Sequence, residues 1–153
     1  MKKICSLLLV LPFLLGCNKQ EYKGPKIKVE YNATGDLISS TPEYMYTHAF
    51  QESVSSIFYI GDDTCSGCAK LKPQLKSWCE VYHGAIYYIP WKSVTEDNEH
   101  YLIDATTSDG IYGWKHGDSV PAVFFFMDGY VVNRTSETDT MSYLMKYVEV
   151  NNN

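Results

Sequence analysis

Two cysteines, Cys65 and Cys68, are separated by two residues and are the side chains best suited to chemistry. An apolar run over residues 57–60 precedes them, and a helical pattern over residues 69–82 follows. At the start of a helix, unpaired N–H groups and the helix dipole stabilise an anion, and the thiolate is the form that attacks a disulfide. This strand–turn–helix setting predicts a redox-active dithiol. Cys65 is the expected nucleophile, and Cys68 is the expected thiol that resolves the mixed disulfide.

Two other interpretations of the pair remain open at this level. The same cysteines could form a static structural disulfide. They could also bind zinc, but a zinc site needs two more ligands, and no metal-like spacing links the histidines at positions 48, 83, 100 and 116. We therefore expect no metal and no cofactor, with electrons passing to or from a partner protein.

Cys79 is too far along the chain to join the dithiol. It follows Cys68 by eleven residues, or about 16 Å along a helix, and a disulfide cannot span that distance. It also shares an apolar helical face with Leu71, Leu75 and Trp78. This pattern favours a buried, unreactive thiol. The alternative is an exposed third thiol that pairs with a partner protein.

The N-terminus predicts export. Lys2 and Lys3 precede an apolar stretch over residues 4–15, which is typical of a secretory signal peptide. The stretch ends in Gly16-Cys17, and a small residue before cysteine resembles the bacterial lipoprotein signal. That resemblance implies cleavage before Cys17, a lipid on Cys17 and a domain held at the cell membrane, facing outside the cytoplasm. An ordinary signal peptide with an accidental cysteine, or an uncleaved anchor, would be the alternative.

Composition and charge limit the remaining classes. Without residues 1–16 the chain has 137 residues, enough for one domain with a core, and its formal charge changes from −5 to −7 because Lys2 and Lys3 are lost. An acidic surface argues against binding nucleic acid or anionic lipid. Thirteen tyrosines and three tryptophans are first interpreted as core. We expect a signal peptide over 1–16, a lipidated cysteine, tether and possible first strand over 17–40, and a domain over 41–150.

Hydrophobic periodicity and turn residues predict the elements of the mature chain. Thr41 and Pro42 suit a helix start, Gly84 a helix C-cap, Asp128-Gly129 a hairpin turn, and Ser136 or Thr138 a cap for the last helix. The expected strands cover residues 26–31, 56–60, 85–89, 122–127 and 130–133, and the expected helices cover residues 41–52, 66–82, 95–105 and about 137–148, with a loop over 108–119.

This order of elements, βαβ and then ββα, resembles the thioredoxin superfamily over residues 41–148. Three features carry the resemblance: the Cys65/Cys68 pair after a strand, Pro73 five residues beyond Cys68, and Val120-Pro121 before an apolar strand. The resemblance implies an α/β thioredoxin-like fold with a central mixed sheet flanked by helices. It further implies that Pro73 kinks the active-site helix, that Pro121 is cis and beside the sulfurs, and that the backbone at Val120 pairs with an extended substrate.

A closer likeness is to bacterial thioredoxin-like proteins of the bacteriocin transport accessory type, which have a similar Gly-x-x-x-Cys-x-x-Cys run starting here at Gly61. The chain departs from thioredoxin at three places: Thr64 replaces a Trp, Tyr59 replaces a buried acid, and Ser66-Gly67 replaces Gly-Pro. These departures do not change the predicted fold, but they bear on whether the protein reduces disulfides as strongly as thioredoxin does.

Several side chains near the pair have a structural and a functional interpretation. Asp62 and Asp63 would disfavour a nearby thiolate, but solvated turn acids are the preferred interpretation. A core tyrosine is preferred over a proton donor for Tyr59. Core packing or loop anchoring is preferred over a peptide groove for Trp91 and Trp114.

Together these observations predict a membrane-anchored, extracytoplasmic thiol–disulfide oxidoreductase. Its partners would be secreted or surface proteins with thiols or disulfides, and a membrane redox partner. The alternative is a non-catalytic accessory protein that uses the same fold to bind an exported peptide. The direction of electron transfer is open, with a slight preference for reduction or isomerisation.

Overall fold

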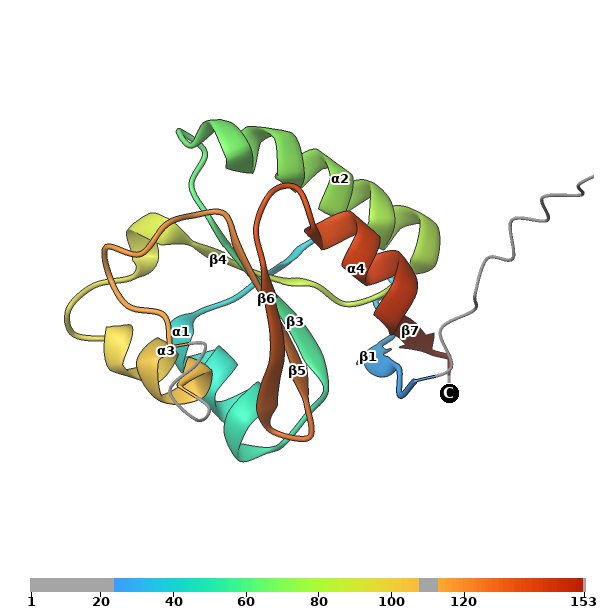
Figure 1. The fold of residues 1–153 in the computed structure, drawn as a ribbon, viewed down its shortest axis with the longest axis horizontal. Helices are drawn as coiled ribbons and strands as arrows, with labels where there is room; N and C mark the ends of the chain where they lie inside the picture. The colour runs from blue at the N-terminus through green and yellow to red at the C-terminus, as the bar shows by residue number, and fades with distance from the viewer. Residues whose placement is uncertain (1–23, 108–112, 153) are drawn as a thin grey trace, which may run out of the picture.

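The computed structural model describes residues 24–107 and 113–152, which form one α/β unit (Figure 1). The predicted signal peptide and Cys17 lie outside the described residues. The elements in chain order are β1 (Ile27–Glu30), β2 (Ile38–Ser39), α1 (Pro42–Met45), the π-helical η1 (Tyr46–Gln51), β3 (Ser56–Gly61), α2 (Ser66–Tyr82), β4 (Tyr87–Pro90), the 3₁₀ turn η2 (Trp91–Ser93), α3 (Glu99–Thr106), β5 (Ala122–Met127), β6 (Tyr130–Thr135), α4 (Thr140–Tyr147) and β7 (Val148–Asn151).

Five strands form the central mixed sheet in the order β2-β4-β3-β5-β6. Strands β2, β4 and β3 run parallel, whereas β5 is antiparallel to β3 and to β6. Helix α2 connects the parallel strands β3 and β4, as a parallel pair requires a crossover connection. Residues Ile60 and Ala122 pair across β3 and β5, so the end of β3 lies beside the start of β5.

The sheet is buried on both faces, which explains why its central strands are almost continuously apolar. On β3, Phe58 and Ile60 join a core cluster with residues of α1, η1 and α3. The alternate residues Ile57 and Tyr59 join a second cluster with α2 and α4. The period-2 alternation of a strand therefore supplies two cores from one sheet.

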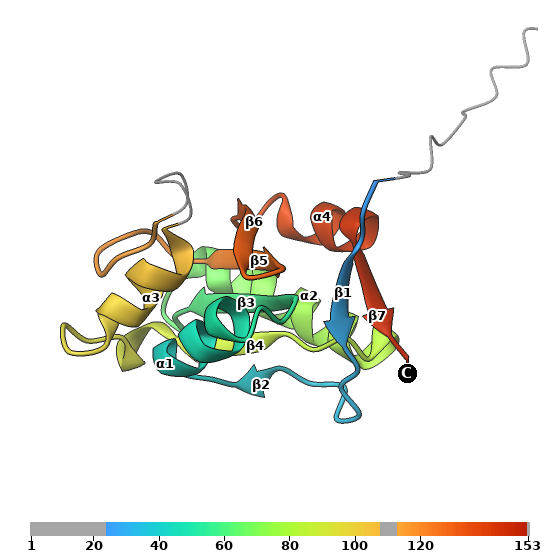
Figure 2. The same ribbon diagram turned by 90° about the horizontal axis from the view of Figure 1, so that it is seen from below.

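Strands β1 and β7 form a separate parallel pair beside the main sheet (Figure 2). Ile27 and Val29 of β1 are buried and pack in the same cluster as α2. The expected strand over 26–31 is confirmed, but β7 was not predicted, and it starts where the last helix was expected to end, at about residue 148. The two-residue strand β2 was also missed.

The helix ends show which local signals determined the structure. The Thr41 side chain accepts a 3.1 Å hydrogen bond from the Tyr44 N–H, so its predicted cap is confirmed. The last helix begins after Asp139, which makes no side-chain capping bond, so neither Ser136 nor Thr138 is its cap. The Asp128-Gly129 turn is confirmed, with φ of +53° and +87°.

The prediction that Gly84 caps α2 is wrong. His83 is the residue in the left-handed conformation after α2, with φ of +54°. Gly84 is small for another reason: a Cβ there would overlap the indole ring of Trp78. Position 84 therefore requires glycine because the Trp78 ring leaves no room for a side chain, and not because the backbone is left-handed there.

Among the described residues, none of the helices combines the length and the apolar character needed to cross a membrane.

Candidate active site

The two cysteines lie at the turn from β3 into α2. Asp62 forms that turn: its Oδ1 accepts a 2.9 Å hydrogen bond from the Thr64 N–H, and its carbonyl accepts one from the Cys65 N–H at 3.2 Å. Cys65 is the N-cap residue of α2, with extended backbone angles. Its sulfur accepts a 3.2 Å hydrogen bond from the Cys68 N–H. Cys65 therefore satisfies an N–H group at the helix end, as a capping side chain does.

The two sulfurs are 2.6 Å apart and belong to free thiols. Their spacing lets side-chain rotation bring them to the disulfide bond length of about 2.05 Å. Cys65 is partly exposed, whereas Cys68 is only 1 % exposed. An incoming disulfide can thus meet Cys65, and Cys68 is shielded behind it.

The Val120–Pro121 segment forms the other side of the site. Its peptide bond is cis, as the resemblance implied. The carbonyl oxygen of Val120 lies 3.4 Å from the Cys65 sulfur and can accept a hydrogen bond from the Cys65 thiol. The pairing of β3 with β5 brings these residues together although they are far apart in sequence.

Burial dominates the chemistry of Cys68. Removal from water raises the pKa of the Cys68 thiol to about 11, and its hydrogen bond to Cys65 acts in the same direction. The Asp62 N–H, 3.4 Å from the Cys68 sulfur, opposes this shift. The thiol form of Cys68 is therefore favoured at neutral pH while the site is reduced.

Asp62 and Asp63 are turn acids, which confirms the preferred interpretation. Hydrogen bonds from Thr64 hold the pKa of Asp62 below its usual value. A 2.8 Å ion pair with Lys72 does the same for the pKa of Asp63. Both carboxylates therefore interact with residues near the surface, Asp62 with Thr64 and Asp63 with Lys72.

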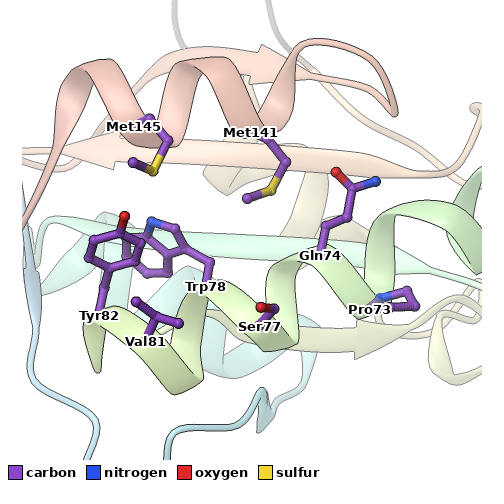
Figure 3. Close-up of a pocket in the computed structure, with 8 residues that line it drawn as sticks. All are labelled: Pro73, Gln74, Ser77, Trp78, Val81, Tyr82, Met141 and Met145. Carbon is purple, nitrogen blue, oxygen red and sulfur yellow. The ribbon is translucent and has the colours of Figure 1, made fainter.

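Pro73 lies inside α2, which continues without interruption from Ser66 to Tyr82. It also lines a groove of about 480 Å³ between α2 and α4 (Figure 3). The other lining residues are Gln74, Ser77, Trp78, Val81, Tyr82, Met141 and Met145. Neither cysteine of the dithiol lines this groove, and Val120 and Pro121 do not line it either.

The tryptophans behave largely as core residues. Trp114 is fully buried and meets Trp91 edge to face at 5.3 Å between ring centroids. Trp91 is only partly buried and stacks on His116 at 4.8 Å. Core packing is confirmed for Trp114.

Glu137 is a neighbour of the site that the sequence did not single out. A Cβ on Gly67 would lie 2.8 Å from its Oε2 and 3.1 Å from Cδ of Pro121. Glu137 also pairs with Lys70 of α2 at 3.0 Å. The loop between β6 and α4 thus places a carboxylate beside the dithiol, and only the tertiary fold reveals this.

Cys79 is fully buried within the apolar face of α2, so the expected buried thiol is confirmed. Burial raises its pKa to about 12. Across the described residues, no three His, Cys, Asp or Glu side chains gather in an arrangement that could hold a metal ion.

We expect the reduced protein to lose stability as the pH rises above about 9. A thiol in the unfolded chain ionises near pH 8.5, whereas Cys68 and Cys79 stay protonated in the folded chain until about pH 11 and 12. Their contribution is complete below the unfolded pKa and is lost as the pH rises toward the folded pKa, at no more than about 1.4 kcal/mol per pH unit for each thiol. Urea unfolding between pH 8 and about pH 10 would measure this slope. Cys79→Ala should flatten it, and an unchanged slope would contradict the assigned cause.

Neither a protein-family model nor a curated protein sequence matches this chain. Solved structures do match. One, described as a putative oxidoreductase with a thioredoxin fold, is 17% identical, with a TM-score of 0.53 over 69% of this chain and 87% of that one. Thioredoxin O2 from Arabidopsis thaliana in the oxidised state is 14% identical, with a TM-score of 0.52 over 77% and 99%. A chain from the complex of ferredoxin:thioredoxin reductase with thioredoxin f2 is 15% identical, with a TM-score of 0.51 over 72% and 94%. The described chain therefore has a thioredoxin-like α/β fold.

Proposed function

We propose that the protein is a thiol–disulfide oxidoreductase with Cys65 as its nucleophile and Cys68 as its resolving thiol. One observation carries the proposal: Cys65 is partly exposed, and its sulfur caps α2, lies 2.6 Å from the Cys68 sulfur and faces the carbonyl of Val120 before a cis proline. The thioredoxin-fold neighbours, one of them described as a putative oxidoreductase, fit this chemistry.

The reaction proceeds by two exchanges at sulfur. The Cys65 thiolate attacks a substrate disulfide, so that a Cys65–substrate bond forms and one substrate sulfur leaves as a thiolate. Cys68 loses its proton and attacks the Cys65 sulfur, which releases the second substrate thiolate. Two electrons pass from the dithiol to the substrate, and the protein is left with a Cys65–Cys68 disulfide. Oxidation of a substrate dithiol is the same sequence in reverse.

In this proposal the backbone at Val120 binds the substrate. Its carbonyl faces the Cys65 sulfur, and the residue is partly exposed. An extended peptide that adds along this segment would gain main-chain hydrogen bonds with modest side-chain selectivity. Such binding suits an enzyme that accepts several protein substrates.

We further propose that the domain is tethered outside the cytoplasm by a lipid on Cys17, as the Gly16-Cys17 pattern after the apolar stretch indicates. Residues 18–26 separate that cysteine from β1, and the ten Cα–Cα steps from Cys17 to Ile27 span at most about 36 Å. The domain would thus work close to the membrane, on secreted or surface proteins, with a membrane protein that resets its dithiol.

The replacement Cys68→Ala should trap substrate on Cys65. Without a resolving thiol the mixed disulfide cannot collapse, so a covalent adduct should accumulate when the reduced variant meets insulin or a disulfide peptide. Non-reducing electrophoresis and mass spectrometry would detect the adduct at Cys65. Cys79→Ala is the matched control and should form no lasting adduct. Peptide binding without any thiol-dependent adduct would point to a non-catalytic role and defeat the proposal.

The replacement Cys17→Ala should release the domain from the membrane fraction of a bacterial expression host. Lipid attachment through two or more acyl chains gives stable anchoring, which the variant lacks. Fractionation and labelling with a fatty-acid analogue would measure the change. Cys79→Ala should stay with the membrane, and an unlabelled wild-type protein would exclude the lipid.

The direction of exchange is set by the reduction potential of the Cys65–Cys68 pair. A potential near −270 mV, about that of thioredoxin, would favour reduction of substrates, and one near about −120 mV would favour oxidation. Equilibration with glutathione buffers followed by thiol trapping would measure it.

A further inference from the structure

Tyr59 has a buried hydroxyl group near the dithiol. It lies on β3, two residues before Gly61, and its side chain is fully buried. The ring reaches over Gly61, where a Cβ would overlap the phenol oxygen. Gly61 thus leaves room for a hydroxyl at the end of β3 that faces α2.

Among the described residues, no group makes a hydrogen bond with this hydroxyl. An unpaired hydroxyl in a protein interior is costly, and a tyrosine hydroxyl usually finds a partner when buried. Tyr88, stacked on Tyr59 at 5.2 Å, directs its own hydroxyl to the Gly61 carbonyl at 3.4 Å. After burial, the nearby Cys68 thiol is the main group that raises the pKa of the Tyr59 phenol, and Tyr88 and Cys65 contribute less.

The surroundings of Cys68 offer donors and no buried base. The Asp62 N–H points at the Cys68 sulfur from 3.4 Å, whereas the Asp62 carboxylate turns to Thr64. Asp63 is paired with Lys72 on the rim. Over residues 24–107 and 113–152, no Asp or Glu side chain is buried.

We propose that Tyr59 is a hydrogen-bond donor to the Cys68 thiolate in the resolving step, and that together with the Asp62 N–H it forms a two-donor site for the charged sulfur. This role rests on the proposed oxidoreductase function. It gives the unpaired hydroxyl a partner at the stage of the reaction when the sulfur is negative. The carboxylates around the dithiol are engaged by other groups: Asp62 by Thr64, Asp63 by Lys72 and Glu137 by Lys70.

The protonation of Tyr59 agrees with this role. Burial, and after it the nearby Cys68 charge, raises the pKa of the phenol well above its usual value. The phenol therefore keeps its proton at working pH and can donate a hydrogen bond but cannot act as a base. In the resolving step Cys68 loses its proton to solvent or to the leaving substrate thiolate. The new Cys65–Cys68 bond replaces the Cys65–substrate bond, and Tyr59 is chemically unchanged.

Donation by Tyr59 should speed resolution. A hydrogen bond to the charged form lowers the pKa of Cys68 and increases the fraction of thiolate, while nucleophilicity falls by only about half as much on a logarithmic scale. The net effect is a faster attack at neutral pH, which offsets part of the penalty that burial imposes on Cys68.

The replacement Tyr59→Phe tests the role, with Tyr88→Phe as the matched control. Reduced protein is mixed with one equivalent of dithiobisnitrobenzoate, which places an aromatic thiol on Cys65 and releases a first coloured thiolate. Attack by Cys68 then releases a second one, whose rate is followed against pH. We expect Tyr59→Phe to slow the second release about three- to ten-fold at neutral pH and to move its pH midpoint upward by about one unit. Tyr88→Phe should follow the wild-type profile.

The outcomes separate the two proposals. A wild-type second release with the same pH profile in Tyr59→Phe overturns the donor role and leaves the oxidoreductase function intact. A wild-type protein that releases only the first thiolate defeats the oxidoreductase function, and the donor role with it. Thermal unfolding of the reduced variants gives a further check. Tyr59→Phe should be as stable as the wild type or more so, because it removes an unpaired buried hydroxyl, and a clear loss of stability would show a structural bond and overturn the role.

Discussion

Replacing Cys65 by Ser is expected to lower the turnover of a disulfide substrate at least about 100-fold, to the uncatalysed baseline. A serine hydroxyl is not ionised at neutral pH and cannot form the mixed disulfide, so Cys68 has nothing to resolve. Cys65 is partly exposed and Cys68 is only 1 % exposed, so Cys68 cannot take over the first attack. Reduction of insulin, followed by the aggregation of its free chains, measures the effect.

The fold should survive this change, since a partly exposed side chain seldom alters stability by more than about 1 kcal/mol. Circular dichroism and urea unfolding would confirm it. Cys79→Ala is the matched control: it also removes one thiol, from the fully buried position in α2, and should keep wild-type turnover. Undiminished turnover in Cys65→Ser would refute the nucleophile assignment and, with it, the proposed reaction.

The parts of this structure that depend on local sequence were predictable. β5 occupies the expected residues, Ala122–Met127, because a buried central strand needs an unbroken apolar run. The dithiol lies at the expected helix start because strand, turn and helix follow one another within a few residues. The Asp128-Gly129 turn was predictable because few other residue pairs accept two positive φ angles.

The parts that depend on packing were not predictable from local patterns. β7 alternates exposed and half-buried residues over only four positions, and its partner β1 lies at the other end of the described chain. Gly84 resembles a helix cap, but the constraint on it is the ring of Trp78. Local sequence propensity predicts neither feature, because the pairing of β7 with β1 and the packing of Trp78 over Gly84 both depend on the tertiary fold.

The same division holds within the site. Cys65 and Cys68 are found from their spacing, and Pro121 was placed beside them only through the resemblance to a known fold. Glu137 carries no motif, and its approach to Gly67 follows from how the loop between β6 and α4 returns to the dithiol. Tyr59 was expected to be buried, and it is, but the position of its hydroxyl depends on the space above Gly61. The spacing of the cysteines in the sequence therefore identifies the reacting sulfurs, whereas tertiary packing identifies the neighbouring groups, such as Glu137 and Tyr59, that surround them.

Replacing Phe124 by Ala is expected to have the largest effect on stability. Phe124 is fully buried in the middle of β5, opposite Phe58 of β3, in the core cluster that joins the sheet to α1 and α3. Truncating a buried phenylalanine to alanine removes its apolar contacts and leaves a cavity, and such changes cost about 3–5 kcal/mol. A domain of this size has about 5–15 kcal/mol of stability in total, so the variant should lose a large part of it.

Urea unfolding of the reduced protein would measure that loss, and Phe50→Ala would serve as the matched control. Phe50 is 39 % exposed at the end of η1, and its truncation should cost less than about 1 kcal/mol. The pairing of Ile60 with Ala122 holds the end of β3, before the dithiol, beside the cis proline at the start of β5. Phe124→Ala should therefore abolish activity only to the extent that the molecule unfolds. The Phe124→Ala protein should thus recover activity on cooling or with a stabilising osmolyte, whereas Cys65→Ser should not. If Phe124→Ala cost no more than Phe50→Ala, the assignment of β5 to the centre of the core would be wrong.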